Sequence, residues 1–227
     1  MLNSKVFLLF LMISASAVSS QPENLQLLRT KTETRLQEIA ASVRGAMGLA
    51  VIDLKSGERF GVNENMLFPQ GSAIKIPILM EVFKQAQAGK FKLSELRPVG
   101  KNYQIGGSGV LQFMEILYKG EFLNRATCDE ILAILKMPKA GSINAALPAE
   151  ADIPVAFKPG GIAGVATEWA IVFLKERPYI VTIMENYALA NETENAMKEI
   201  SRTLYDYFWR LGRATKYGTY VEPEVMK

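Results

Sequence analysis

The strand-like segments of this sequence fall into two groups, which a long helical stretch separates. Runs 48–54 and 58–63 are apolar and lie one short turn apart, a spacing that predicts an antiparallel hairpin. Three further runs, 155–158, 167–174 and 179–184, are rich in β-branched and aromatic residues, and a short turn joins the last two. Because short connections favour antiparallel pairing, we expect one antiparallel sheet of about five strands.

Helical patterns precede, interrupt and follow these strands. Apolar residues recur at helical spacing in 25–43, 72–88, 123–135 and 191–211, and we expect Asn191 to be the N-cap of the last helix. This order predicts an α+β fold, in which the N- and C-terminal helices flank the sheet on one face. The other two helices form an insert between the second and third strands.

The composition is that of one ordinary globular domain, with 49% hydrophobic and 22% charged residues among 227. The net charge is +3, and the Lys and Arg residues are scattered, so we expect a solvated surface and no nucleic-acid partner. Cys128 is the single cysteine and there is no histidine, which excludes an intrachain disulfide and argues against a zinc site. We expect a buried structural thiol at Cys128 and no cofactor or metal.

Residues 1–20 have the pattern of a secretory signal peptide. Lys5 precedes the apolar run 6–13, and small residues follow, so cleavage after Ala17 or Ser20 is expected. The run is shorter than the roughly 20 residues that span a bilayer. We therefore expect a periplasmic or secreted protein with no stable membrane anchor; the alternative is an uncleaved anchor.

Ser72 and Lys75 lie one helical turn apart at the start of a predicted helix. A serine becomes an effective nucleophile when a neighbouring group takes its proton. The absence of histidine excludes a Ser-His-Asp triad, whereas a lysine three residues on lies on the same helix face. Free N–H groups at the helix start favour an oxyanion beside the serine. The alternative is a capping Ser72 and a surface Lys75.

A second candidate segment is Lys158-Pro159-Gly160-Gly161, on the third predicted strand. Glycines within a strand allow another backbone or a ligand to approach closely. The alternative is an ordinary strand end that leads into a turn.

Together, these segments resemble the serine β-lactamase and penicillin-binding superfamily, most closely class A. Residues 68–79 resemble its nucleophile segment, 107–111 the loop that enters its helical half, and 158–165 its Lys-Thr-Gly strand. The resemblance covers nearly all of the chain after the signal peptide and implies one serine hydrolase domain at 21–227. It implies a small-molecule β-lactam or peptidoglycan-like substrate, and we expect a monomer.

The resemblance also implies residue roles. Ser72 would attack the lactam carbonyl and become acylated, and Lys75 would take its proton. Lys158 and Gly160 would bind the substrate, Lys158 by attracting its carboxylate. The backbone N–H groups of Ser72 and Gly161 would form the oxyanion hole.

Three features depart from the family pattern. The sequence contains no Ser-Asp-Asn motif, and Pro159 stands where the family has threonine. The glutamate of an omega-shaped loop, which activates water for deacylation, is also missing, because residues 111–113 run directly into the helical segment 114–122. Glu115 and Glu121 are nearby, but on a segment of a different form. The helical half therefore looks truncated after about residue 113.

These departures leave three hypotheses open. The first is a hydrolase that opens β-lactams through a Ser72 acyl-enzyme, as in β-lactam catabolism and antibiotic resistance. The second is a catalytically impaired or inactive penicillin-binding-like protein that acylates without turnover. The third is a truncated product that folds poorly, because the apolar face of helix 72–88 would be exposed.

Overall fold

The computed structural model describes residues 22–93, 104–215 and 218–219, so the predicted signal segment 1–20 lies outside the described residues. Five strands form one antiparallel sheet in the order β2-β1-β7-β6-β5. They are β1 (Ala46–Asp53), β2 (Arg59–Val62), β5 (Val155–Ile162), β6 (Val165–Val172) and β7 (Tyr179–Asn186). The predicted five-stranded α+β architecture is confirmed, and the sheet has β2 and β5 at its two edges.

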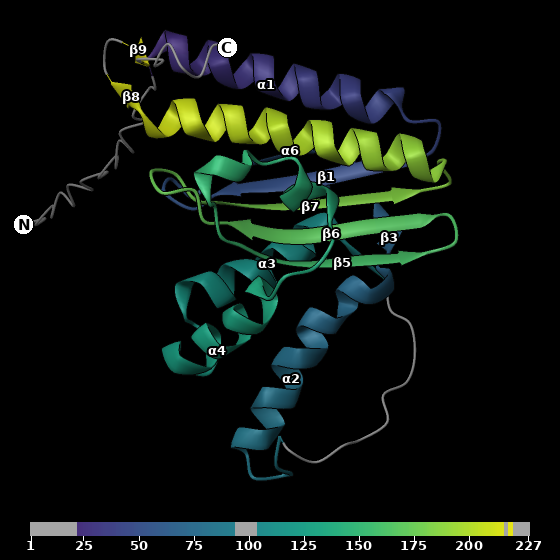
Figure 1. The fold of residues 1–227 in the computed structure, drawn as a ribbon, viewed down its shortest axis with the longest axis vertical. Coiled ribbons are helices and arrows are strands. Elements are labelled where there is room, and N and C mark those ends of the chain that lie inside the picture. The colour runs from purple at the N-terminus through teal and green to yellow at the C-terminus, as the bar shows by residue number, and fades with distance from the viewer. Residues whose placement is uncertain (1–21, 94–103, 216–217, 220–227) are drawn as a thin grey trace, which may run out of the picture.

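Helices α1 (Glu23–Ser42) and α6 (Ala190–Gly212) lie together across one face of the sheet (Figure 1). Alternate side chains of a strand point to opposite sides of the sheet. In these strands apolar residues occupy both sets of positions, so both faces of the sheet are apolar. On this side Leu49 and Val51 of β1 join the core that α1 and α6 cover. This arrangement matches the expected packing of the terminal helices on one face.

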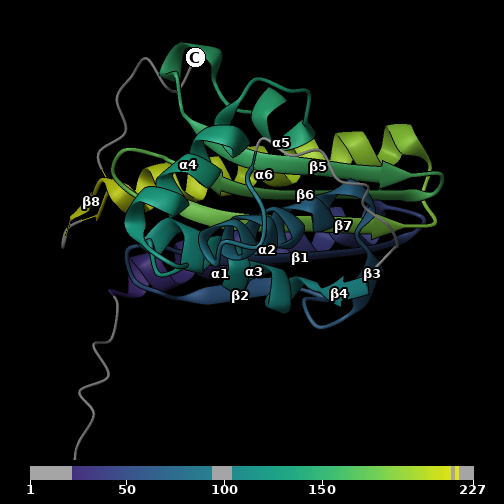
Figure 2. The ribbon, with the colours of Figure 1, turned by 90° about the horizontal axis from the view of Figure 1, so that it is seen from below.

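The opposite face is covered by α2 (Lys75–Gln87), α3 (Gly107–Lys119) and α4 (Arg125–Lys136), as Figure 2 shows from that side. A second core joins these helices to the sheet and includes Ile52 of β1 and Trp169 of β6. The α2 side chains in it are Ile76, Met80 and Phe83, each at most 5% exposed. These apolar side chains of α2 are therefore covered, and not exposed as the third hypothesis assumes.

Shorter elements complete the described fold. Strands β3 (Leu67–Pro69) and β4 (Gln104–Gly106) pair beside the sheet, and β8 (Ala214–Thr215) pairs with β9 (Gly218–Thr219). The turns η1 (Gly71–Ile74), α5 (Ser142–Ala145) and η2 (Ala149–Ala151) connect larger elements. Cys128 on α4 is buried, as expected. No helix among the described residues is long and apolar enough to cross a membrane.

Two local predictions were wrong. Asn191 is not the N-cap of α6, because the helix begins at Ala190 with Leu189 in the capping position and no side-chain cap. The predicted helix 72–88 begins as the 3-10 turn η1, and α2 starts at Lys75. Pro77 has no N–H to donate to a carbonyl four residues earlier, so the preceding residues close a tighter turn, in which the Lys75 N–H bonds to the Ser72 carbonyl.

Candidate active site

Ser72 lies within η1, and Lys75 follows as the first residue of α2. Lys75 Nζ donates a hydrogen bond to Ser72 Oγ at 3.1 Å, so the two side chains meet as their spacing predicts. Gly71, just before the serine, has φ +48°, a left-handed conformation that favours glycine. The turn thus presents the Ser72 hydroxyl directly to the lysine amine.

Strand β5 packs against this turn at its two glycines. A Cβ on Gly160 would lie 2.5 Å from both the Ala73 nitrogen and the Gln70 carbonyl oxygen. A Cβ on Gly71 would lie 2.8 Å from the Gly161 nitrogen. The missing side chains allow the backbones to approach at these distances. The structure thus places Gly160 and Gly161 beside Ser72, although the segments are far apart in the sequence.

Lys158, two residues before Gly160 on β5, lies in a positive environment. Its Nζ donates to the Pro159 carbonyl at 2.5 Å. Partial burial lowers the pKa of Lys158, and the charges of Lys75 and Lys139 lower it further. The amine of Lys158 therefore lies in a positive environment, which favours an anionic group of a ligand.

Lys139 was not predicted from the sequence, because no motif marks it as a neighbour of Lys158. It lies in the loop between α4 and α5, and its Nζ donates to the carbonyls of Leu135 and Met137 at 2.6 Å each. Burial lowers the pKa of Lys139. Its closeness to Lys158 depends on the path of that loop, which no local pattern encodes.

Pro159 is tolerated because β5 is an edge strand of the sheet. Residue 159 provides neither an N–H nor a hydroxyl for a ligand. Thr167, on the neighbouring strand, pairs with Gly160, but its hydroxyl donates to the Gln70 carbonyl at 2.9 Å. The polar groups of the site therefore come from the lysines, Ser72 and the backbone.

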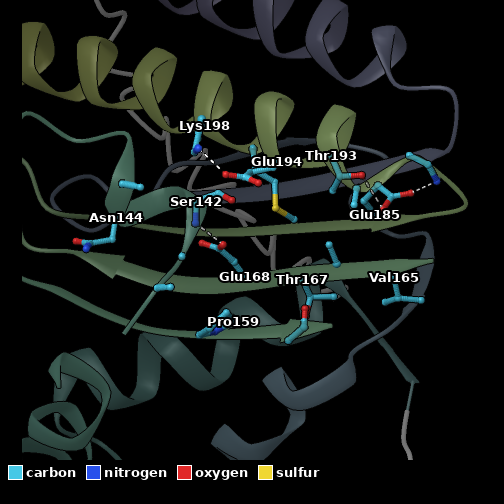
Figure 3. A pocket seen from close by; sticks show the side chains of 18 of the residues that line it. Ser142, Asn144, Pro159, Val165, Thr167, Glu168, Glu185, Thr193, Glu194 and Lys198 are labelled. Carbon is cyan, nitrogen blue, oxygen red and sulfur yellow. Dashed lines mark hydrogen bonds and ion pairs between the residues drawn. The ribbon is translucent and has the colours of Figure 1, made fainter. Parts of the chain in front are cut away.

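A cavity of about 550 Å³ lies on the α6 side of β5 and β6, and its lining does not include Ser72, Lys75 or Lys158 (Figure 3). Glu168 and Glu185 are buried carboxylates in its lining, and Glu168 accepts hydrogen bonds from the amides of Ser142 at 2.5 Å and Ile143 at 2.9 Å. Burial raises the pKa of Glu168, although these two amides oppose the shift. The amides occupy both carboxylate oxygens, so Glu168 holds α5 in place.

The sequence profile of the Beta-lactamase enzyme family matches residues 31–116 and 110–208, which together make up more than half of the chain. The chain belongs to this family. No curated protein sequence matches it significantly.

Solved structures of β-lactamases share the fold of this family member. A β-lactamase from Chitinophaga pinensis is 19% identical, with a TM-score of 0.67 over 78% of this chain and 98% of that one. An ancestral class A β-lactamase is 17% identical, with a TM-score of 0.70 over 78% and 100% of the two chains. PBP-A is 18% identical, with a TM-score of 0.65 over 79% and 96%. At these identities the likeness establishes the fold alone.

The two glutamates near the predicted truncation lie in other surroundings in this β-lactamase family member. Glu115 on α3 forms ion pairs with Arg59 of β2 and with Lys119. Strand β2 is at the opposite edge of the sheet from β5, which carries Lys158. Glu121 is exposed between α3 and α4. Neither position resembles a carboxylate held beside Ser72.

Proposed function

We propose that this chain is a serine hydrolase of the β-lactamase type that opens β-lactam rings through an acyl-enzyme at Ser72. The observation that carries the proposal is the 3.1 Å hydrogen bond between Lys75 Nζ and Ser72 Oγ, beside the glycines of β5. This pairing of nucleophile and base needs no histidine. The family match supports the same class of reaction.

Each residue of the site has a role in the proposed reaction. Lys75 acts as the base and takes the hydroxyl proton as Ser72 Oγ bonds to the lactam carbonyl carbon. The lactam C–N bond then breaks, its nitrogen receives the proton that Lys75 took from Ser72, and an ester remains on Ser72. The N–H groups of Ser72 and Gly161 stabilise the oxyanion, where one lost donor typically costs about 10²–10³ in rate. Lys158 binds the substrate carboxylate, and Gly160, which has no side chain, lets β5 approach the Ser72 turn and so forms part of the substrate site.

The second candidate function is a penicillin-binding-like protein that is acylated and then stalls. The surroundings of the glutamates favour it: Glu115 is paired at the far edge of the sheet, and Glu168 is bound to the α5 amides on the other face. Deacylation needs an activated water, and none of these carboxylates is placed to activate one at Ser72. The family match also falls into two segments that overlap at residues 110–116, where the sequence predicts a shortened helical half. A PBP-A variant has been solved as an acyl-enzyme with penicillin G.

The test compares covalent labelling with turnover. The protein is incubated with a fluorescent penicillin and, separately, with a chromogenic cephalosporin, and the adduct is located by peptide mass spectrometry. Ser72→Ala and Lys75→Met should abolish or strongly slow labelling. Lys84→Met removes an exposed lysine from the same helix and should have no effect. Turnover that needs Ser72 supports the hydrolase, and a stable label without turnover supports the stalled protein. No label on a cooperatively folded wild type contradicts both.

We further propose that the protein acts as a monomer outside the cytoplasm on small β-lactam or peptidoglycan-like molecules, since residues 1–20 have the pattern of a signal peptide. An exported protein whose N-terminus begins after Ala17 or Ser20 would support this. Retention of residues 1–20 on a cytoplasmic protein would contradict it.

A further inference from the structure

Gln70 is a buried polar residue two positions before the proposed nucleophile, with its side chain bound on both sides. The residue is 1% exposed. Its Oε1 accepts a hydrogen bond from the Trp169 indole N–H at 2.9 Å, and its Nε2 donates to the Phe68 carbonyl at 2.8 Å. The same Nε2 lies 3.3 Å from Met184 Sδ. One amide thus connects the chain before η1 to strands β6 and β7.

The backbone carbonyl of Gln70 is bound as well. It accepts from the Ala73 N–H at 3.0 Å, which closes the turn that contains Ser72. It also accepts from Thr167 Oγ1 at 2.9 Å. We call Gln70 with its partners Phe68, Ala73, Thr167 and Trp169 the Gln70 network.

The β6 members of this network lie directly opposite the proposed ligand-binding residues. In the register of β5 with β6, Trp169 pairs with Lys158 and Thr167 pairs with Gly160. The network therefore joins the nucleophile turn to the part of the sheet that positions Lys158, Gly160 and Gly161.

We propose that Gln70 is a positioning residue, whose side-chain amide holds the Ser72 turn at the distance from β5 that acylation requires. The inference rests on the proposed function, because it assigns Gln70 an effect on acylation at Ser72. Oxyanion donors act only when they are aimed at the developing charge, and a misplacement of about 1 Å can cost about 10²-fold in rate. Gln70 itself does not touch the substrate.

The test separates positioning from stability. Gln70→Met keeps the side-chain volume but removes both hydrogen-bonding groups, and it leaves the buried Trp169 N–H without this partner. We expect the limiting acylation rate with fluorescent penicillin to fall about 10- to 100-fold, with little change in the penicillin concentration that gives half of that rate. The melting temperature should fall too.

The double variant Gln70→Met/Trp169→Phe also removes the indole N–H that Gln70→Met leaves without this partner, so the melting temperature should partly recover while acylation stays slow. Leu36→Ala, in the core under α1 on the other side of the sheet, is the control: it should lower the melting temperature and leave acylation within twofold.

Three results would overturn the inference. If Gln70→Met is acylated at the wild-type rate, Gln70 has no positioning role, and the proposed function is unaffected. Recovery of acylation together with the melting temperature in the double variant would reduce Gln70 to a purely structural role. A wild type that takes up no label would refute the proposed function and this inference with it.

Discussion

At the scale of single residues, Lys158 combines a proposed binding role with surroundings that disfavour its charge. Its pKa is lowered from the ordinary value of 10.5 by partial burial and by the charges of Lys75 and Lys139. A lysine with a lower pKa in the folded than in the unfolded chain destabilises the fold while it is charged. This cost is fully present below the lowered pKa, and it is lost as the pH rises through the lowered pKa toward 10.5.

We therefore predict that Lys158→Met leaves the melting temperature at pH 7 unchanged or higher, yet slows penicillin labelling about 10- to 100-fold. The loss corresponds to a hydrogen bond to a charged group, about 1.5–3 kcal/mol. Thermal melting and labelling kinetics measure the two effects, and Lys158→Arg, which keeps the charge, is the control. A lower melting temperature with unchanged labelling would contradict both parts.

At the scale of elements, the site depends on the close approach of β5 to η1. We predict that Gly160→Ala destabilises the protein by about 1–3 kcal/mol, because the new Cβ would lie 2.5 Å from two backbone atoms of the nucleophile turn. Labelling at Ser72 should fall with it, since the turn must move. Urea unfolding and the labelling assay measure these effects.

The matched control is the next residue on the same strand. A Cβ on Gly161 would meet only the Val165 carbonyl, at 3.4 Å, an ordinary contact. Gly161→Ala should therefore change the unfolding free energy by less than about 1 kcal/mol. Equal losses in the two variants would mean that the approach of β5 to η1 is not the cause.

At the scale of the whole molecule, the helices that cover the second face of the sheet share one core. Helices α3 and α4 pack in this core with Phe83 and Met80 of α2. We predict that Phe83→Ala costs about 3 kcal/mol of unfolding free energy in a single cooperative transition. Leu27→Ala on α1, where the leucine is 56% exposed, should cost less than about 0.5 kcal/mol. A negligible loss in Phe83→Ala would indicate that α2 is not packed as described.

The strands and long helices were predictable because their signals are local. The apolar run 48–54 and the turn after it specify a hairpin, and the structure has β1 paired with β2. The end of a helix is less determined. Asn191 is a good capping residue by type, but α6 starts one residue earlier, at Ala190. In the first turn of the helix, the Thr193 hydroxyl donates a hydrogen bond to Glu185 of β7.

In the candidate site, too, contacts between residues close in sequence were predictable, and contacts between distant residues were not. Ser72 and Lys75 are three residues apart, so one turn of the chain is enough to bring them together, and the spacing alone predicts their contact. The contacts of Gln70 with Thr167 and Trp169 join residues 97 and 99 positions apart. Such contacts depend on which strands become neighbours and how closely they pack, and local periodicity carries no information about either. The sequence alone therefore predicts the contact between Ser72 and Lys75, the proposed nucleophile and base, whereas the packing of β5 and β6 on their turn arises only when the sheet is assembled.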